Sequence, residues 1–270
     1  MTEDLVLTRR NGAVFEMTLN RPKANAINRA MSRAIYAALK TLLDDPVASV
    51  GIVTGAGERI FSAGWDLKEE ALGYDPDLDA DPEAGNGPGG FAGITEFWGL
   101  TKPVIAAVNG AAVGGGFEIA LACDVILMAE NAFFQLPEMQ RGILPDAGAI
   151  QRLPRLIPPN VAKEMLLTGR RMEPDEALRW GLVHKVVPQS RLMDEARALA
   201  AEIAKGAPLA LRALKEVLAA IDGMPLPQAM AKTKPGRSGL PIYERMMRSE
   251  DMQEGMRAFA EKREPHWKGK

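Results

Sequence analysis

The chain has 270 residues, of which 47% are hydrophobic, and its formal net charge is −2. This length and composition allow one large core, as a single domain or as a domain with an appendage. The basic residues do not gather into one strong cluster, which argues against nucleic acid as the main partner. No apolar run reaches membrane-spanning length, and the first residues do not resemble a secretion signal. The sequence therefore predicts a soluble cytoplasmic protein that binds no membrane.

Cysteine and histidine are scarce. The single cysteine, Cys123, rules out a disulfide within the chain and fits a reducing compartment. It has no basic neighbour and is interpreted as a small core residue. The two histidines, His184 and His266, stand in neither a G-x-S-x-G nor an H-E-x-x-H motif, and no P-loop or G-x-G-x-x-G fingerprint follows a strand. We therefore expect no metal site.

The first hundred residues alternate strand and helix patterns. Residues 5–9 and 14–19 read as two strands joined by an Asn-Gly turn, which is a strong hairpin signal. Residues 25–43 have apolar side chains at helical spacing, and 50–54 read as a buried strand. The acidic segment 74–90, rich in glycine and proline, is expected to be an exposed loop.

The alternation continues and then stops. A strand–turn–helix unit is expected over 102–122, with further strands at 124–128 and 182–187. Such alternation predicts the α/β class. From about residue 190 the pattern is helical only, so we predict a core over residues 1–195 and a helical region over 196–270. The helical region contains the methionines Met246, Met247, Met252 and Met256. They pack either against a partner subunit or on the chain's own core, and both alternatives stay open.

Two segments of small residues form the first candidate for a functional site. Residues 61–67 and 109–118 each follow a strand-like apolar run. Small side chains leave backbone N–H groups uncovered, and two such groups aimed at one point make an oxyanion hole. The second segment enters a helical pattern in which Gly115 and Glu118 share a face. A helix N-terminus and a carboxylate would then address the same substrate, which suits chemistry next to a carbonyl.

A second carboxylate extends this site. Glu138 follows the strand-like run ending at Met128, and two carboxyl groups around an apolar cleft can divide acid and base roles. Glu118 is the only charged side chain between Val113 and Ala122, which favours a functional role. Taken by itself, Glu138 is more readily interpreted as a solvated surface charge.

Six motifs follow one another along the chain: residues 20–26 (NRPKANA), 61–67 (FSAGWDL), 102–110 (KPVIAAVNG), 114–118 (GGGFE), 136–138 (LPE) and 168–171 (TGRR). Together they resemble the crotonase, or enoyl-CoA hydratase/isomerase, superfamily over nearly the whole chain. The resemblance implies a spiral of ββα units with two roughly perpendicular sheets, followed by helices that mediate trimerisation. Trimers of this family often pair into hexamers. The resemblance also implies acyl-CoA thioester substrates, with coenzyme A entering as part of the substrate and no separate cofactor.

The resemblance assigns expected roles to individual residues. Ala63 and Gly115 match the oxyanion-hole positions, and Glu118 and Glu138 match the two catalytic glutamates. Candidate residues for binding the substrate and its CoA are Lys23, Ala24, Gly64, Trp65, Asp66, Leu67, Gly114, Asp146 and Lys262. Asp146 also matches a position that has a catalytic aspartate in dienoyl-CoA isomerases.

Within the superfamily, the chain is most similar to the carnitinyl-CoA dehydratases, in stretches such as 61–68, 168–172 and 259–269. This implies reversible hydration of crotonobetainyl-CoA to L-carnitinyl-CoA. Three alternatives remain: a general short-chain enoyl-CoA hydratase of β-oxidation, a dienoyl-CoA isomerase that uses Glu138 and Asp146, and a non-catalytic scaffold that binds thioesters or RNA.

A trimethylammonium substrate would require aromatic side chains, because this group has no hydrogen to donate and is recognised by aromatic faces. Trp65 lies within the first candidate segment and is the preferred candidate. The further aromatic residues near the expected cleft are Phe91, Phe97, Trp98 and Phe117.

Overall fold

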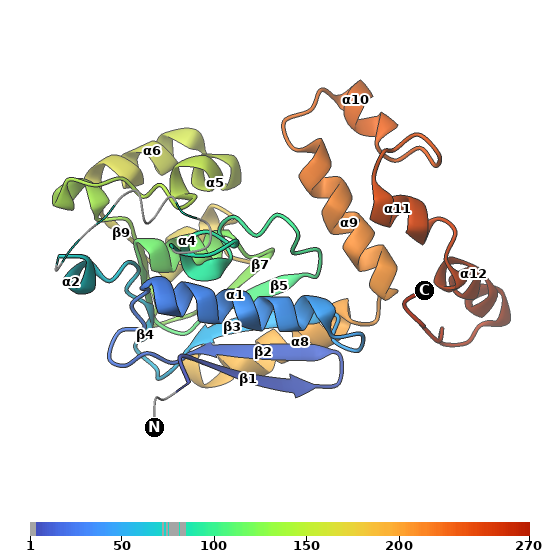
Figure 1. Ribbon diagram of the computed structural model, residues 1–270, viewed down its shortest axis with the longest axis horizontal. Helices are drawn as coiled ribbons and strands as arrows, with labels where there is room; N and C mark the ends of the chain where they lie inside the picture. Colours follow the sequence, from blue (N-terminus) through green and yellow to red (C-terminus); the bar gives the residue numbers. More distant parts are fainter. Residues whose placement is uncertain (1–3, 72, 74, 76–80, 82–84) are drawn as a thin grey trace.

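The computed structural model describes residues 4–71, 73, 75, 81 and 85–270. An α/β body with two sheets makes up most of the molecule, and the C-terminal helices project from it as an arm (Figure 1). Most of the loop expected over 74–90 lies outside the described residues. Among the described residues, no helix is both long and apolar enough to cross a membrane.

The larger sheet has six strands among the described residues, in the order β1-β2-β3-β5-β7-β10. The predicted hairpin is confirmed, since β1 pairs with β2 antiparallel, and the remaining pairs are parallel. Strands β3 and β5 are buried along their whole length, which explains their continuous apolar runs. The bounds are β1 Val6–Asn11, β2 Val14–Leu19, β3 Val50–Gly55, β5 Val104–Val108, β7 Val125–Ala129 and β10 Lys185–Val187.

The smaller sheet has four strands in the described part of the chain, in the order β4-β6-β8-β9. The chain passes from the large sheet to the small one three times, from β3 to β4, from β5 to β6 and from β7 to β8. Each passage brings a strand end of the large sheet close to the small sheet, which is where the candidate segments lie. The bounds are β4 Ile60–Ser62, β6 Ala111–Val113, β8 Phe134–Gln135 and β9 Arg171–Met172.

Helix α1 (Arg29–Asp44) is the amphipathic helix expected from the sequence, but it begins four residues later than predicted. Asn25 has a positive φ of 48°, and the side chain of Asn28 accepts a hydrogen bond from the Met31 N–H as the N-cap. The local capping chemistry, rather than the apolar periodicity, therefore sets the start of this helix.

Short helices lie between the strands of the two sheets. They are α2 Leu67–Glu70, η1 Phe91–Gly93, α4 Gly115–Leu121, η2 Glu138–Arg141, α5 Ala149–Leu156, α6 Pro159–Thr168 and α7 Pro174–Arg179. Helix α4 follows β6 directly, so the expected strand–turn–helix unit is present, with an additional strand between its strand and its helix. Figure 1 shows α4 and α5 on the side of the molecule away from β1 and β2.

The C-terminal third is helical, as expected, but only part of it leaves the body. Helix α8 (Leu192–Ile203), reached through η3 (Gln189–Arg191), packs against the large sheet and buries Ala196 and Ala200 in the main core. The division expected between residues 195 and 196 falls inside this helix. The arm consists of α9 Pro208–Ile221, α10 Leu226–Ala231, α11 Pro241–Met246 and α12 Glu250–Glu261.

The arm has a small hydrophobic core of its own, formed by Ala213, Val217, Leu240 and Tyr243. Met246 and Met247 pack against this core and are half-buried, so these two methionines do not form a free docking face. Other large apolar side chains of the arm are exposed, and Phe259 is 88% exposed: the set is Leu214, Leu218, Leu226, Met230, Met256 and Phe259.

Candidate active site

The two segments of small residues lie against each other, backbone to backbone. A Cβ on Gly64 would lie 2.6 Å from the Gly115 nitrogen, and one on Gly116 would collide with the Ser62 carbonyl. Gly64 also has a φ of +78°, which an L side chain rarely adopts. Glycine at these positions therefore allows the end of β4 to touch the start of α4, and the structure brings the predicted segments together.

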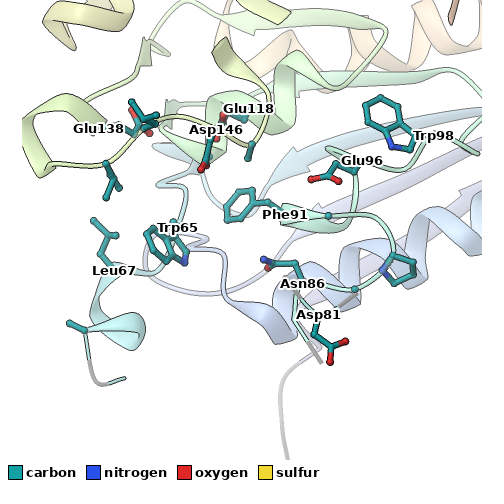
Figure 2. Close-up of a pocket in the computed structure, with 18 residues that line it drawn as sticks. Trp65, Leu67, Asp81, Asn86, Phe91, Glu96, Trp98, Glu118, Glu138 and Asp146 are labelled. Carbon is teal, nitrogen blue, oxygen red and sulfur yellow. The ribbon is translucent and has the colours of Figure 1, made fainter. Parts of the chain in front are cut away.

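A cavity of about 950 Å³ opens at this junction. Figure 2 shows the two glutamates and Asp146 above the rings of Trp65 and Phe91, with Glu96 and Trp98 farther along the wall. Gly115, at the first turn of α4, lines the same cavity. The cavity thus joins a helix N-terminus to a group of carboxylates and aromatic rings.

Glu118 is 3% exposed and lies on α4. The Ala149 N–H, at the start of α5, donates a hydrogen bond to its Oε1 atom over 2.9 Å. Burial raises the pKa of Glu118 to about 7, the charges of Glu138 and Asp146 add to the rise, and the Ala149 N–H opposes it. Glu118 can therefore give up or take a proton near neutral pH.

Glu138 is 7% exposed and begins the short helix η2. Its Oε1 atom lies 2.5 Å from the place that a Cβ on Gly114 would occupy. Its Oε2 atom is buried and has no hydrogen-bond partner among the described residues. Burial raises the pKa of this carboxyl as well. A buried carboxyl oxygen without a partner is costly for the fold. The Glu138 side chain lines the cavity, where a bound substrate or water molecule can supply a donor to its carboxyl group.

The expectation for Ala63 is wrong. The Ala63 N–H donates to the Ala24 carbonyl oxygen over 2.9 Å, so in this structure it is not available to a substrate. Sequence reasoning missed this bond because Ala24 belongs to a different loop, brought beside β4 by the fold. Gly115 begins α4 and lines the cavity, and the first N–H groups of a helix have no partner within the helix. Its role as an oxyanion-hole donor stays a prediction.

The expected binding residues separate into two groups. Trp65, Leu67 and Asp146 line the cavity. Gly64 and Gly114 instead support it through the close contacts described above.

Other expected CoA-binding residues lie elsewhere. Asp66 forms an ion pair with Arg21, with 2.6 Å between Oδ2 and Nη2. Lys23 is exposed, and neither it nor Ala24 lines the cavity. Lys262 follows the end of α12 and does not line the cavity. Figure 1 shows α12 on the arm, apart from α2 and α4, which contribute residues to the cavity wall. The role of these residues in binding CoA stays a prediction.

The aromatic candidates also divide. Phe91 and Trp98 line the cavity. Phe117 is fully buried and stacks on Phe134 with 4.1 Å between ring centroids, so it belongs to the core. Phe97 packs against a tyrosine of α1 instead of lining the cavity.

The sequence analysis missed two acidic residues of the cavity wall, Asp81 and Glu96. Asp81 lies in a stretch that was interpreted as an exposed loop, and Glu96 stands in a segment without a recognisable motif. No local signal marks either of them, because the turns around η1 bring Glu96 over Gly90 and into the wall. In the described part of the chain, no group of three or more His, Cys, Asp or Glu side chains is placed to hold a metal ion.

A helix N-terminus facing two buried carboxyl groups defines an acid/base site for chemistry next to a carbonyl. Comparison with known proteins agrees with this class. The family model described as enoyl-CoA hydratase/isomerase matches residues 9–270. The chain belongs to the enoyl-CoA hydratase/isomerase family.

Individual relatives cover the whole chain. Proteins of Salmonella paratyphi A and Salmonella agona named carnitinyl-CoA dehydratase are 54% identical over 270 residues, which is 100% of this chain and of theirs. The crystal structure of enoyl-CoA hydratase from Mycobacterium tuberculosis H37Rv is 37% identical, with a TM-score of 0.87 over 99% of this chain and 100% of that one. The crystal structure of an enoyl-CoA hydratase from Mycobacterium marinum is 38% identical, with a TM-score of 0.88 over 99% of this chain and 100% of that one. The crotonase fold expected from the sequence is confirmed.

Proposed function

We propose that this protein adds water reversibly to a 2-enoyl-CoA, with crotonobetainyl-CoA as the preferred substrate and L-carnitinyl-CoA as the product. The observation that carries the proposal is that Glu118 and Glu138 line one cavity with Gly115 at the N-terminus of α4. The relatives named carnitinyl-CoA dehydratase, identical at 54% of positions over the full length, support the choice of substrate.

The thioester oxygen is held by backbone N–H groups. The Gly115 N–H is one donor, and we assign the second to the backbone of Trp65, because Trp65 lines the same cavity as Gly115. As the hydroxyl adds to Cβ, negative charge moves onto the thioester oxygen, where these donors stabilise it. Loss of one such donor costs about 3–4 kcal/mol in comparable sites.

The two glutamates share the proton transfers. One carboxylate takes a proton from the incoming water as its oxygen bonds to Cβ, and the other carboxyl group gives a proton to Cα, so water adds across the double bond. The free Oε2 atom of Glu138 and the raised pKa of Glu118 suit groups that exchange protons during turnover. The reverse order of the same steps removes water.

The charge of the cavity supports a cationic acyl group. The described residues that line it include no lysine or arginine, but five carboxylic acids: Asp81, Glu96, Glu118, Glu138 and Asp146. Three aromatic rings, of Trp65, Phe91 and Trp98, line it as well. A trimethylammonium group is attracted both by aromatic faces and by a negative field, whereas the methyl group of crotonyl-CoA gains little from either.

This mechanism uses only carboxyl groups and backbone amides, so the proposal includes no metal and no bound cofactor. It also includes a cytoplasmic location, which the lone cysteine supports. We further propose a trimer or hexamer assembled through the arm, because exposed apolar side chains such as those of the arm mark surfaces that are buried against another subunit.

The purified protein tests the proposal when it is offered crotonobetainyl-CoA, crotonyl-CoA and a 3,5-dienoyl-CoA, with water uptake followed by ¹⁸O incorporation. A higher kcat/KM for the betaine is the expected result. An equal or lower value would leave a general short-chain enoyl-CoA hydratase. A shift of conjugation in the dienoyl-CoA without water uptake would indicate an isomerase, and binding without any turnover would indicate a scaffold.

A further inference from the structure

Arg152 is a half-buried residue of α5 that lies one turn beyond Ala149, the residue whose N–H holds Glu118. Its Nη2 atom donates a hydrogen bond to the Thr95 carbonyl oxygen over 2.6 Å. Its Nη1 atom lies against Gly148, where a Cβ would collide with it. The guanidinium group is thus fixed between the start of α5 and the segment 91–98.

The segment held by Arg152 positions the cavity wall. Thr95 is buried, and its hydroxyl donates to the Phe91 carbonyl oxygen over 2.9 Å. The Phe91 ring in turn lies against Gly115, since a Cβ on that glycine would be 2.5 Å from Cζ. Arg152 therefore connects α5, whose Ala149 N–H bonds to Glu118, to the segment that places an aromatic ring beside the thioester site.

The charge of Arg152 also reaches the carboxyl groups. Within the described part of the chain, the groups whose charges act on Glu118 are Glu138 from η2, Asp146 from the turn before α5, and Arg152 from α5 itself. Arg152 is the positive member of this set, and it interacts with Glu96 as well. Among the described residues it has no ion pair, because its guanidinium is bonded to the Thr95 carbonyl instead.

The absence of a direct ion pair between Arg152 and Glu118 matters for proton transfer. A directly paired arginine lowers a carboxyl pKa by about 1–3 units, which would keep Glu118 ionised throughout the neutral range. A guanidinium held by Thr95 acts more weakly and only moderates the rise that burial causes. Glu118 then stays able to exchange a proton near neutral pH.

We infer that Arg152 is a positioning residue of the reaction: it joins the N-terminus of α5 to the segment 91–98 and supplies the positive charge that faces Glu118 without pairing with it. The inference rests on the proposed hydration only for its kinetic readout. It assigns Arg152 no contact with substrate.

The test compares Arg152→Gln, Arg152→Lys and a matched control, Arg155→Gln. Arg155 lies on the same helix but is exposed and pairs with Asp222, so its removal changes the net charge equally without touching Thr95. The pH profile of kcat/KM is measured for crotonobetainyl-CoA. In parallel, Glu118 is titrated by its carboxyl infrared band, identified as the band that Glu118→Gln removes.

Arg152→Gln is expected to move the Glu118 titration, and the kinetic limb that follows it, to higher pH by about 0.5–1 unit, less than a direct pair would cause. Arg152→Lys keeps the positive charge but loses the planar guanidinium group. It is expected to leave the Glu118 titration near that of the parent protein and to raise KM several-fold. Arg155→Gln is expected to change neither.

An unmoved Glu118 titration in Arg152→Gln would overturn the inference, as would an equal shift in Arg152→Lys or Arg155→Gln. If Arg152→Gln does not fold, the lysine variant decides: an unchanged KM refutes the connecting role, and a shifted titration refutes the charge role. The infrared titration does not need turnover, so failure of the hydration proposal leaves a separate answer for Arg152.

Discussion

The ring of Phe91 lies against the Cα atom of Gly115, so closely that a Cβ at position 115 would be 2.5 Å from the ring Cζ. Gly115 is therefore required for more than an uncovered N–H group. It allows an aromatic ring from a distant segment to form the cavity wall beside the N-terminus of α4, where we propose that the thioester oxygen binds.

Gly115→Ala tests this relationship. The added methyl group pushes the Phe91 ring into the cavity and displaces the donor, so we expect kcat/KM for enoyl-CoA hydration to fall about 100-fold, as for a misplacement of about 1 Å. Steady-state kinetics measures this. The control is Gly99→Ala, because a Cβ on Gly99 meets only ordinary contacts from 3.5 Å. Full activity in Gly115→Ala would contradict the packing argument.

The acid/base role of the glutamates predicts that Glu118→Gln and Glu138→Gln each lower kcat by about 100- to 10,000-fold. Glutamine keeps the size of the side chain, and at position 118 it can still accept the Ala149 N–H, so KM should change little. Stopped assays with crotonobetainyl-CoA measure the loss. Glu130→Gln, on an exposed residue outside the cavity, is the control. The mechanism is wrong if both variants keep near-normal rates.

The raised pKa of Glu118 predicts that this residue destabilises the folded protein at alkaline pH. Between pH 4.5 and about pH 7, the carboxyl group of the folded protein holds a proton that the unfolded chain has lost. The free energy of unfolding therefore falls as the pH rises through this window. The penalty is absent below the window and complete above it. Glu118→Gln should therefore be more stable than the parent at about pH 8, by roughly 3 kcal/mol, and similar to it below about pH 4.5.

Denaturant unfolding at the two pH values measures this difference. Glu130→Gln, which replaces an exposed carboxyl group, should show no such dependence on pH. A stability gain of the same size at both pH values would show that the ionisation of Glu118 is not its cause.

The preference for a cationic acyl group predicts that Trp65→Ala reduces the ratio of kcat/KM for crotonobetainyl-CoA to that for crotonyl-CoA. One cation–π contact is worth about 0.5–2 kcal/mol, or roughly 2- to 30-fold in this ratio. The backbone N–H of residue 65 is retained in the variant. Trp180→Phe, which alters a tryptophan bonded to Glu176 outside the cavity, should leave the ratio unchanged. A ratio that Trp65→Ala does not lower would assign recognition of the cation to other groups.

The exposed apolar side chains of the arm predict that the protein assembles into a homo-oligomer. Leu218 is 56% exposed and Phe259 is 88% exposed, so Leu218→Asp and Phe259→Glu should disrupt an interface without disturbing the core of the single chain. Light scattering at micromolar concentration should give a trimer or hexamer for the parent and smaller species for these variants. Gln253→Glu adds a charge to an exposed position of α12 as the control. A stable monomeric parent would contradict the prediction.

The sequence by itself determined the class and much of the site. Apolar periodicity and the Asn-Gly turn predicted the hairpin, the strands of the large sheet and the amphipathic α1, because burial of a continuous or one-sided apolar pattern is a local property. The glycine-rich segments, with Glu118 placed three residues after Gly115, predicted the helix N-terminus and the carboxylate on one face.

Only the tertiary structure decided which backbone donors stay open, what each carboxyl group faces and how the wall is built. The Ala63 N–H is bonded to Ala24, the Ala149 N–H holds Glu118, and Arg152 reaches Thr95, each through a contact between segments far apart in the chain. Hydrogen bonds and desolvation depend on which groups the fold brings within a few ångströms. Spacing along the sequence does not encode those distances, so the hydrogen bond of the Ala63 N–H and the surroundings of Glu118 could be found only in the folded protein.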